Sequence, residues 1–263
     1  METTAAALAP SPLALLRVGW RLTAAAALTV AGYLVIVLGR LACVGRRRRA
    51  DAWSDRVVAA WARRVGRLFG MRCRVVGTPP PAPFLLVANH LSYVDVLALL
   101  GAAGGAFVAK REIASWPVVG RLCRLIGVVF IDRTARRDVR RVGVGVEAAL
   151  AEGRGIAIFP EGTTGDGSAL LPFRSSLLEV AAARRLPVYW ATLRYGTGDG
   201  LPDAAEAICW TGGAALVPHA LRLLSLPGFE ARVAFGAEPL ADDDRKRLTA
   251  RLREAMAAEL VRA

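Results

Sequence analysis

The sequence predicts an α/β fold with a mixed, largely parallel sheet flanked by helices, preceded by an N-terminal membrane-associated helical segment. From residue 84 onward, short apolar runs are each followed by a polar motif and then by a helical stretch, which is the pattern of βα units. Before them, residues 22–39 carry no charged side chain. About 200 residues remain beyond this apolar N-terminus, a length that suits one α/β domain.

The uncharged run Leu22–Gly39 is 18 residues long and as a helix would span roughly 27 Å, close to the ~30 Å hydrocarbon core of a bilayer. Four arginines, 46–49, follow it, whereas the flank before it offers only Arg17 and Arg21. This asymmetry predicts the cytoplasmic face of the inner membrane. We expect residues 1–50 to be a membrane anchor with a basic flank, which either crosses the bilayer or enters one leaflet. A cleaved signal peptide is less favoured because the basic run follows directly.

Residues 51–70 predict an amphipathic helix. Apolar side chains recur at helical spacing opposite a set of arginines. The apolar set is Trp53, Val57, Ala60, Trp61, Val65 and Leu68, and the basic set is Arg56, Arg63, Arg64 and Arg67. An interfacial helix and a core-packed helix with a solvated basic face both fit this pattern. Residues 71–263 are then left for a catalytic domain.

The net charge of +13 calls for an anionic partner or surface. An anionic membrane surface fits better than nucleic acid, because the densest basic run lies beside the apolar segment and the aromatic and arginine residues do not interleave as stacking platforms do. The four cysteines are far apart and the chain has only two histidines, so neither a zinc site nor a disulfide framework is expected. We expect reduced cysteines in a domain that faces the cytosol.

Polar motifs follow four predicted strands at the point where each strand ends. The strands are residues 84–88, 107–109, 128–131 and 156–159, and the motifs begin at Asn89-His90, Lys110-Arg111, Asp132-Arg133 and Pro160-Glu161. In an open α/β sheet, ligands bind outside the carboxyl ends of parallel strands. We therefore expect His90, Lys110, Arg133 and Glu161 to face one crevice.

His90 and Asp95 have the chemistry of a base and its orienting carboxylate. A neutral imidazole accepts a hydroxyl proton on one nitrogen, while a carboxylate holds the N–H of the other nitrogen and stabilises the cation that forms. A structural interpretation is also open: Ser92 caps a helix that begins near Tyr93, Asp95 completes a capping box, and His90 only ends a strand.

The other motifs suit binding. Arg133 carries a fork of donors for a phosphate, or else pairs with Asp132 or Asp138. Lys110 is one of only two lysines in an arginine-rich chain, which suggests a need for a compact ammonium. The glycine-rich stretch that begins at Glu161 allows close backbone approach to a substrate, with a plain turn as the alternative.

The sequence has neither a Gly-x-Ser-x-Gly elbow nor a phosphate-binding loop with its lysine. The run Gly143-Val144-Gly145 imitates a dinucleotide fingerprint but falls inside a predicted helix, 135–152, so we interpret its glycines as packing positions. Further on, the pattern predicts a strand near 207–210, a helix near 214–224, a strand at 231–235 and a closing helix at 242–261. His219 lies in the first of these helices and is interpreted as structural.

Together these motifs resemble the lysophospholipid acyltransferase family, across about residues 70–195. The matching blocks, in order, are Asn89 to Asp95 with its His-x4-Asp motif, Lys110 to Arg133, Phe159 to Thr163, and Leu186-Pro187-Val188. The resemblance implies a glycerol-3-phosphate acyltransferase-like fold, with His90 as general base and Asp95 as its orienting carboxylate. It implies substrate binding by Lys110, Arg133, Glu161, Gly162, Thr163 and Arg174. It further implies acyl-CoA or acyl-ACP as the acyl donor, a lysophospholipid as the acceptor, and no metal or other cofactor.

One departure from the family pattern concerns the acceptor. The third block commonly continues Glu-Gly-Thr-Arg, but here Thr164 replaces the arginine and the next basic residue is Arg174. The Glu-Gly-Thr-Thr form, with Trp210 and Pro218-His219, is similar to a branch that includes lyso-ornithine-lipid acyltransferases. Lysophosphatidate is the first expected acceptor and lyso-ornithine lipid the alternative. A catalytically inactive, lipid-surface-binding relative is the alternative from another functional class.

Overall fold

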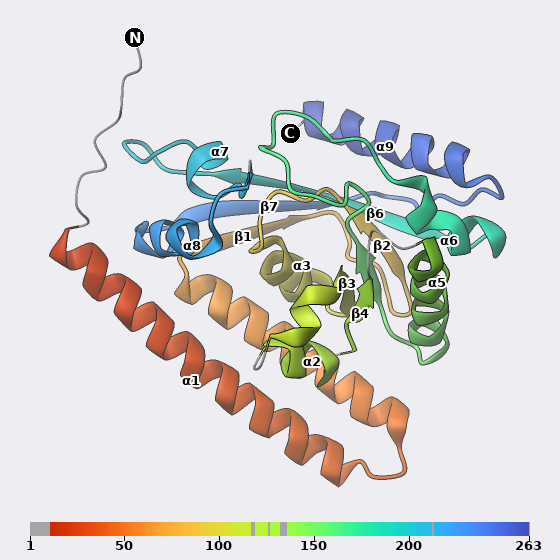
Figure 1. The fold of residues 1–263 in the computed structure, drawn as a ribbon, viewed down its shortest axis with the longest axis horizontal. Coiled ribbons are helices and arrows are strands. Elements are labelled where there is room, and N and C mark those ends of the chain that lie inside the picture. The colour runs from red at the N-terminus through yellow and green to blue at the C-terminus, as the bar shows by residue number, and fades with distance from the viewer. Residues whose placement is uncertain (1–10, 117–118, 126, 132–135, 212, 263) are drawn as a thin grey trace.

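The structure is a computed structural model that describes residues 11–116, 119–125, 127–131, 136–211 and 213–262. Its centre is a sheet with the strand order β1-β7-β6-β2-β5-β3-β4 (Figure 1). The strands are β1 (Met71–Val76), β2 (Leu85–Ala88), β3 (Ala106–Lys110), β4 (Val129–Ile131), β5 (Ile156–Ile158), β6 (Val188–Gly196) and β7 (Phe229–Phe235). The helices are α1 (Pro12–Ala42), α2 (Arg47–Leu68), α3 (Asp95–Ala103), α4 (Val119–Leu125), α5 (Arg136–Ala151), α6 (Glu179–Ala183), α7 (Ala204–Ala207), α8 (Leu216–Ser225) and α9 (Arg245–Arg262), with 3-10 turns at Arg111–Ser115 and Ser175–Leu178.

The sheet is mixed and largely parallel, as the sequence predicts. The strands β6, β2, β5, β3 and β4 run parallel to one another, and β1 runs parallel to β7. The pairing of β6 with β7 is antiparallel. The four predicted strands are therefore β2, β3, β4 and β5, which are adjacent. Their carboxyl ends share one edge, so the motifs that follow them meet there.

Both faces of the central strands are buried, which explains why these strands read as unbroken apolar runs. Alternate residues of β2 belong to different cores. Leu86 and Ala88 face a core that is shared with α2, α3 and α8. Leu85 and Val87 face a second core that is shared with α5, α6 and α9. The sheet is thus the middle of three layers.

The glycine-containing run of the predicted helix lies in α5. A Cβ atom on Gly145 would come within 2.7 Å of Val129 Cγ1, and one on Gly143 would touch Val180 at 3.4 Å. These glycines let the helix approach β4 and α6 closely. The prediction that they are packing positions is confirmed.

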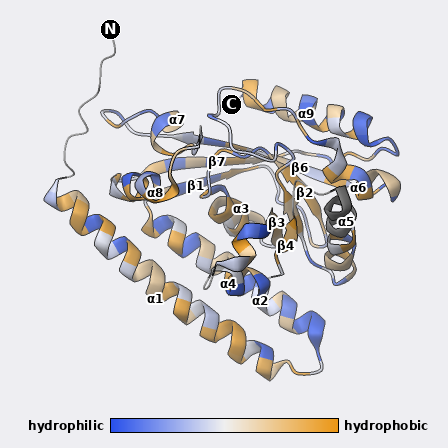
Figure 2. Ribbon diagram, viewed as in Figure 1, coloured by the Kyte–Doolittle hydropathy of each residue, from blue (hydrophilic) through white to orange (hydrophobic). Residues whose placement is uncertain are grey.

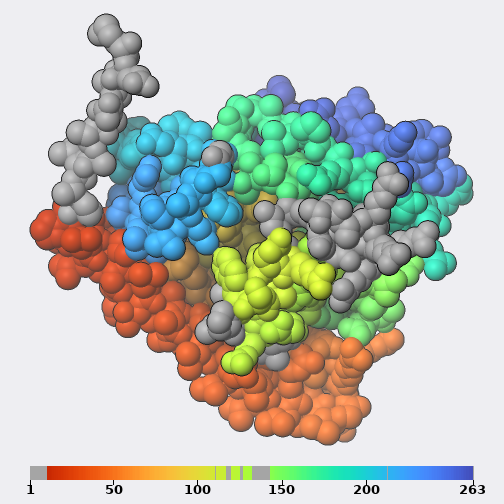
Figure 3. Space-filling model, viewed as in Figure 1, coloured from red at the N-terminus to blue at the C-terminus, as the bar shows by residue number. Residues whose placement is uncertain are grey.

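The helices α1 and α2 pack side by side as an antiparallel hairpin against the α3 side of the sheet (Figures 1 and 3). Helix α1 is 31 residues long and, by length and composition alone, apolar enough to cross a membrane. Figure 2 shows apolar residues along most of its length. Many of its large apolar side chains are exposed, among them Leu13, Leu16, Trp20, Val30, Leu34, Leu38 and Leu41.

Buried polar contacts attach α1 to the body. Arg21 is buried and donates from Nη1 to the carbonyl oxygens of Leu224 (2.9 Å) and Leu226 (2.7 Å). Those carbonyls lie at the carboxyl end of α8, where helical C=O groups have no intrahelical donor. The guanidinium therefore satisfies orphan acceptors of α8 and fixes the direction in which α1 leaves the body.

Helix α2 begins at Arg47, inside the basic run, and its apolar residues contact both the core and helix α1. Val58, Ala62 and Val65 are buried in the core. On the side toward α1, the indole N–H of Trp53 donates to Val35 O (3.2 Å) and that of Trp61 to Thr29 Oγ1 (3.1 Å). The arginines of α2 remain exposed. Their contact with lipid headgroups stays a prediction.

Two expectations for local structure are wrong. Ser92 does not cap a helix: α3 begins at Asp95 after Val94, without a side-chain cap, and the Asp95 carboxylate accepts from the N–H of Ser92 instead. Residues 207–210 do not form a strand. Asp203 caps the short α7 by accepting from Ala205 N, and the apolar residues that follow are buried because they run beside the His90 motif.

Candidate active site

His90 and Asp95 form a hydrogen-bonded pair just beyond the carboxyl end of β2. The distance from His90 Nδ1 to Asp95 Oδ2 is 2.7 Å. The Asp95 side chain is fully buried, whereas 18% of the His90 side chain is exposed. A carboxylate accepts only, so Nδ1 carries the proton and Nε2 is left with a free lone pair. Within the described part of the chain, no hydrogen bond to Nε2 is found.

Asp95 is held by three further donors. The backbone N–H groups of Leu91 (2.7 Å) and Ser92 (3.0 Å) donate to Oδ2, and the Tyr195 hydroxyl donates to Oδ1 at 2.5 Å. Burial and the neighbouring Asp95 charge raise the pKa of Tyr195 well above its usual value, so this hydroxyl keeps its proton. A buried carboxylate with four donors is well compensated for its lost hydration.

The imidazole plane is fixed by its neighbours. The His90 ring stacks on Phe159, with centroids 4.1 Å apart and planes 13° from parallel, and Phe159 stacks in turn on Phe107. Behind it, Asn89 bridges β2 to β6: its Nδ2 donates to Leu193 O, and Leu193 N donates to its Oδ1. The base is thus carried by rigid sheet and helix elements, which favours a defined reaction geometry.

Glu161 follows β5 and lies close to His90 and Asp95. Its side chain is buried, and burial together with the nearby Asp95 charge raises its pKa to about 8, although the neighbouring backbone N–H groups of His90 and Leu171 oppose the shift. The carboxyl therefore holds a proton at neutral pH and offers both a donor and an acceptor. The sequence predicts that Glu161 and His90 lie together, and the structure confirms it.

The loop after Glu161 is attached to the His90 motif. Gly162 has a positive φ of 72°, and a Cβ atom there would lie 2.8 Å from Nε of Arg174, so glycine is required. Arg174 is exposed and its backbone N–H donates to Pro160 O. Thr163 is also exposed. Gly165 N donates to His90 O at 2.8 Å, which ties the loop to the motif of the base.

Two predicted binding residues lie partly or wholly outside the described residues. Lys110 is the last residue of β3, paired with Ile131 of β4, which places its backbone on the predicted edge; its side chain is outside the description. Arg133 lies in the undescribed segment 132–135. Their roles in substrate binding stay predictions.

Sequence reasoning missed two contacts of this site. Tyr195 is 100 residues from Asp95 in the chain and sits on β6 with no local signal of its role. Tyr93, inside the motif, contacts His219 Nδ1 through its hydroxyl at 3.1 Å, and His219 Nε2 contacts Cys209 O at 3.1 Å. Both ring nitrogens of the buried His219 are therefore occupied, as its structural interpretation expects.

Comparisons with known proteins identify the family of this chain. The family model described as "Acyltransferase" matches residues 72–193. A lyso-ornithine lipid O-acyltransferase of Rhizobium meliloti is 34% identical over 215 residues, which cover 77% of this chain and 72% of that protein. A 1-acyl-sn-glycerol-3-phosphate acyltransferase of Neisseria meningitidis is 33% identical over 189 residues, which cover 70% and 72% of the two chains. This chain belongs to the lysophospholipid acyltransferase family.

A solved structure shares the fold. The crystal structure of the 1-acyl-sn-glycerophosphate acyltransferase from Thermotoga maritima superposes with a TM-score of 0.64 at 20% identity, covering 92% of this chain and 97% of that one. Membership makes the chain an O-acyltransferase of lipid biosynthesis. Its exposed apolar helix α1 accords with membrane association.

Proposed function

We propose that this enzyme transfers a fatty acyl group from acyl-CoA or acyl-ACP to the free hydroxyl of a lysolipid, with His90 as the general base. The hydrogen bond of 2.7 Å between His90 Nδ1 and the buried Asp95 carries the proposal. That bond fixes the tautomer with an unprotonated Nε2 on the partly exposed side of the ring. No metal or redox cofactor is required by this chemistry.

The reaction follows from the arrangement. His90 Nε2 takes the proton of the acceptor hydroxyl as its oxygen attacks the thioester carbonyl carbon. A C–O bond forms and the C–S bond breaks, and the imidazolium returns the proton to the leaving thiolate. Asp95 stabilises the imidazolium between these steps. Protonated Glu161 supplies a hydrogen bond in the crevice to the acceptor, beside the loop of Gly162 and Thr163.

Lysophosphatidate is the proposed acceptor, giving phosphatidic acid, with Arg174, Lys110 and Arg133 as the cations that hold its phosphate. Lyso-ornithine lipid is a second candidate, because Thr164 stands where a further arginine is common and its hydroxyl donates to Trp210 O. A threonine held by a backbone carbonyl adds no charge for a phosphate.

We place the active site at the cytoplasmic face of the inner membrane. The exposed run of arginines, 46–49, follows α1 directly, and positive charge is favoured on the cytoplasmic side of a membrane helix. The same arginines suit anionic headgroups.

The test is acyl transfer by the purified full-length enzyme in lipid micelles, offered lysophosphatidate and lyso-ornithine lipid in competition, with acyl-CoA or acyl-ACP as donor and products identified by mass. Turnover of either acceptor by the unaltered enzyme is expected. His90→Ala removes the base, and we expect the rate to fall at least ~10²-fold.

A folding control accompanies the variant, namely thermal unfolding compared with the unaltered enzyme. His90→Ala protein that unfolds at the same temperature and keeps full turnover would contradict the role of His90. Retained binding of lysolipid without any turnover by the unaltered enzyme would instead favour a catalytically inactive lipid-binding protein.

A further inference from the structure

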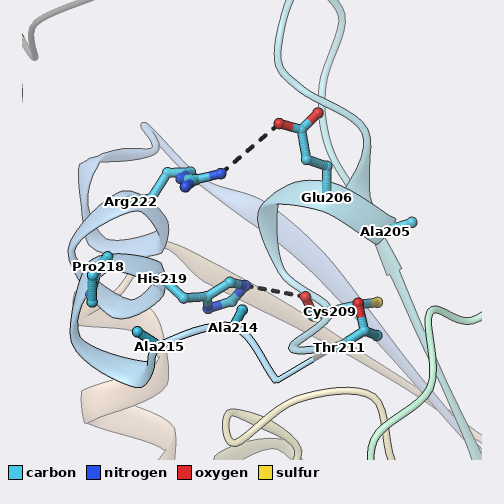
Figure 4. A pocket seen from close by; sticks show the side chains of 9 residues that line it. All are labelled: Ala205, Glu206, Cys209, Thr211, Ala214, Ala215, Pro218, His219 and Arg222. Atoms are coloured by element: carbon cyan, nitrogen blue, oxygen red, sulfur yellow. Dashed lines mark hydrogen bonds and ion pairs between the residues drawn. The ribbon is translucent and has the colours of Figure 1, made fainter. Parts of the chain in front are cut away.

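A cavity of about 240 Å³ lies between α7 and α8, and His90 is not among the residues that line it (Figure 4). Two opposite charges stand at its rim: Arg222 Nη1 is 3.9 Å from Glu206 Oε1. The inner part of its wall is the buried His219, whose Nε2 contacts Cys209 O. Burial lowers the pKa of His219, so the imidazole is uncharged at neutral pH. The cavity thus presents one cation and one anion.

The wall of this cavity is attached to the active-site motifs. Cys209 and Thr211 line the cavity, and Trp210 between them donates its backbone N–H to Leu91 O at 2.8 Å. The carbonyl of Trp210 accepts from the Thr164 hydroxyl. On the other side, His219 contacts the hydroxyl of Tyr93. The residue that departs from the common family pattern, Thr164, is therefore fastened to the segment that lines this cavity.

The two rim charges are available to a ligand. Their separation of 3.9 Å is long for an ion pair, and the side chains of Arg222 and Glu206 are 57% and 70% exposed. Exposed pairs of this kind contribute little, so exchanging one partner for a ligand loses little. A guanidinium matches a carboxylate in a bidentate geometry, and Glu206 matches an ammonium. A phosphate would gain Arg222 but meet the like charge of Glu206.

The cavity opens beside an apolar surface. Val217 and Leu221 of α8 are 66% and 43% exposed, and they neighbour the lining residues Pro218 and Arg222 in the chain. Helix α8 is held to α1 through Arg21, and the exposed side of α1 is also apolar. A ligand headgroup that arrives from a lipid surface reaches this cavity more readily than one that must leave bulk water.

We propose that this cavity is a headgroup site for a lipid that carries both an ammonium and a carboxylate, and that it selects lyso-ornithine lipid as an acceptor. Arg222 binds the carboxylate and Glu206 the ammonium, next to the segment 209–211 that is hydrogen-bonded to Leu91 of the His90 motif. The proposal rests on the second acceptor named under the proposed function and assigns the residues that recognise it.

The first test measures kcat/KM for both acceptors in the unaltered enzyme, in Arg222→Gln and in Glu206→Gln. We expect the ratio of lyso-ornithine lipid to lysophosphatidate to fall about tenfold in each variant, mainly through KM, because each loses a charge-assisted hydrogen bond. The matched control is Arg184→Gln, which removes an exposed arginine paired with Glu147 and should leave the ratio unchanged. An unchanged ratio in Arg222→Gln and Glu206→Gln would overturn the proposal.

A second measurement separates this inference from the catalytic proposal. Binding of the His90→Ala protein to micelles that contain lyso-ornithine lipid requires no turnover. When Arg222→Gln is added to the His90→Ala protein, its affinity for micelles with lyso-ornithine lipid should fall about tenfold more than its affinity for micelles with lysophosphatidate. Equal binding with and without Arg222 overturns the headgroup site even if catalysis is established, and weakened binding supports it even if acyl transfer fails. Competition by free ornithine as strong as by the lipid would overturn the assignment to a lipid headgroup.

Discussion

At the scale of single residues, the site is organised around Asp95 as much as around His90. Each Asp95 oxygen has a defined partner set: Oδ2 accepts from His90 and two backbone N–H groups, and Oδ1 accepts from Tyr195. The two amides come from the motif itself, which wraps around the carboxylate at the start of α3. Among the described residues, the Tyr195 hydroxyl is the one side-chain donor to Asp95 from outside the motif, and it makes the carboxylate position depend on β6.

Tyr195→Phe therefore tests positioning without touching the base. The change removes one donor from a buried carboxylate but leaves the His90 contact possible. We expect kcat to fall about tenfold with little change in KM, since a hydrogen bond to a charged group contributes roughly 1.5–3 kcal/mol and part of it is recovered by relaxation. Steady-state kinetics of the folded variant provide the measurement. A rise in KM at unchanged kcat would point to a role in substrate binding instead.

Glu161 gives a pH prediction at the same scale. Its pKa of about 8 in the folded protein exceeds the usual glutamate value of 4.5, so between these values the folded state holds a proton that the unfolded state has lost. Stability must then fall as pH rises through this window and level off above about 8. From pH 5.5 to 8 the unaltered protein should lose on the order of 3 kcal/mol more than Glu161→Gln. The measurement is the free energy of unfolding of both proteins at the two pH values in the same micelles. If this free energy depends on pH equally in both proteins, the raised pKa of Glu161 is contradicted.

At the scale of elements, the sequence predicts those strands whose burial shows as a continuous run of apolar residues. The strands β2, β3 and β5 are buried on both faces and β4 is half-buried, and all four appear as apolar runs. The edge that they share therefore follows from the motifs that end them. The edge strand β1 was not predicted, because Arg72, Cys73 and Arg74 are exposed. Its sequence therefore shows neither a run of apolar residues nor an alternation of apolar and polar residues. A strand was wrongly predicted at residues 207–210, because apolar residues that are buried against a loop have the same sequence pattern as a buried strand.

Dependence on local sequence patterns also explains which residues of the candidate site could be predicted. His90, Asp95 and Glu161 lie within motifs that end strands, and a parallel sheet brings such ends together whatever its exact strand order. Tyr195, His219 and the segment around Trp210 reach the site only through β6, α8 and an irregular connection. Their contacts depend on three-dimensional packing that no local pattern records.

Two ion pairs connect α2 to the turn before β5, and they should differ in strength. Asp55 accepts from Arg154 Nη2 at 2.7 Å and from Nε at 3.4 Å, with both side chains largely buried. Arg47 contacts Glu152 at 2.6 Å, but its side chain is 76% exposed. Desolvation lowers the pKa of Arg154, yet the hydrogen bonds and charge of Asp55 outweigh this and raise the pKa.

Asp55→Asn is expected to destabilise the folded protein by about 2 kcal/mol, because it removes the charge from a buried bidentate pair. Arg47→Gln is the matched control, and its effect should stay within about 0.5 kcal/mol. The thermal midpoint checks both, with a decrease of about 5 °C expected for Asp55→Asn. Equal, small effects would show that α2 is held by its apolar contacts with α1 and α3 alone.

At the scale of the whole molecule, charge and apolar surface are arranged in layers. The exposed apolar side chains of α1 and the exposed arginines of α2 lie on the α3 side of the sheet, whereas α9 covers the opposite side (Figures 1 and 2). The arginines of α9 are largely neutralised: Arg247 pairs with Asp242 and Asp243, and Arg251 pairs with Asp242. The net positive charge is therefore least compensated beside the helix that favours lipid.

This layering predicts how the protein binds vesicles. Replacing Arg46, Arg48 and Arg49 with Gln should weaken binding to anionic vesicles by up to about 1 kcal/mol per arginine and reduce its salt dependence, because these exposed side chains flank α1. Binding to uncharged zwitterionic vesicles should persist, since the apolar side chains of α1 do not depend on surface charge. Cosedimentation with vesicles of each composition provides the measurement.

The control replaces Arg245, Arg247 and Arg251 of α9 with Gln, which removes the same number of positive charges from the opposite side of the sheet. If net charge alone governed attraction to the membrane, the two triple variants would bind anionic vesicles equally weakly. We expect the α9 variant to bind nearly as well as the unaltered protein, because a surface potential falls off within a Debye length of about 10 Å. Equal loss in both variants would show that the basic composition acts as a whole and not through the flank of α1.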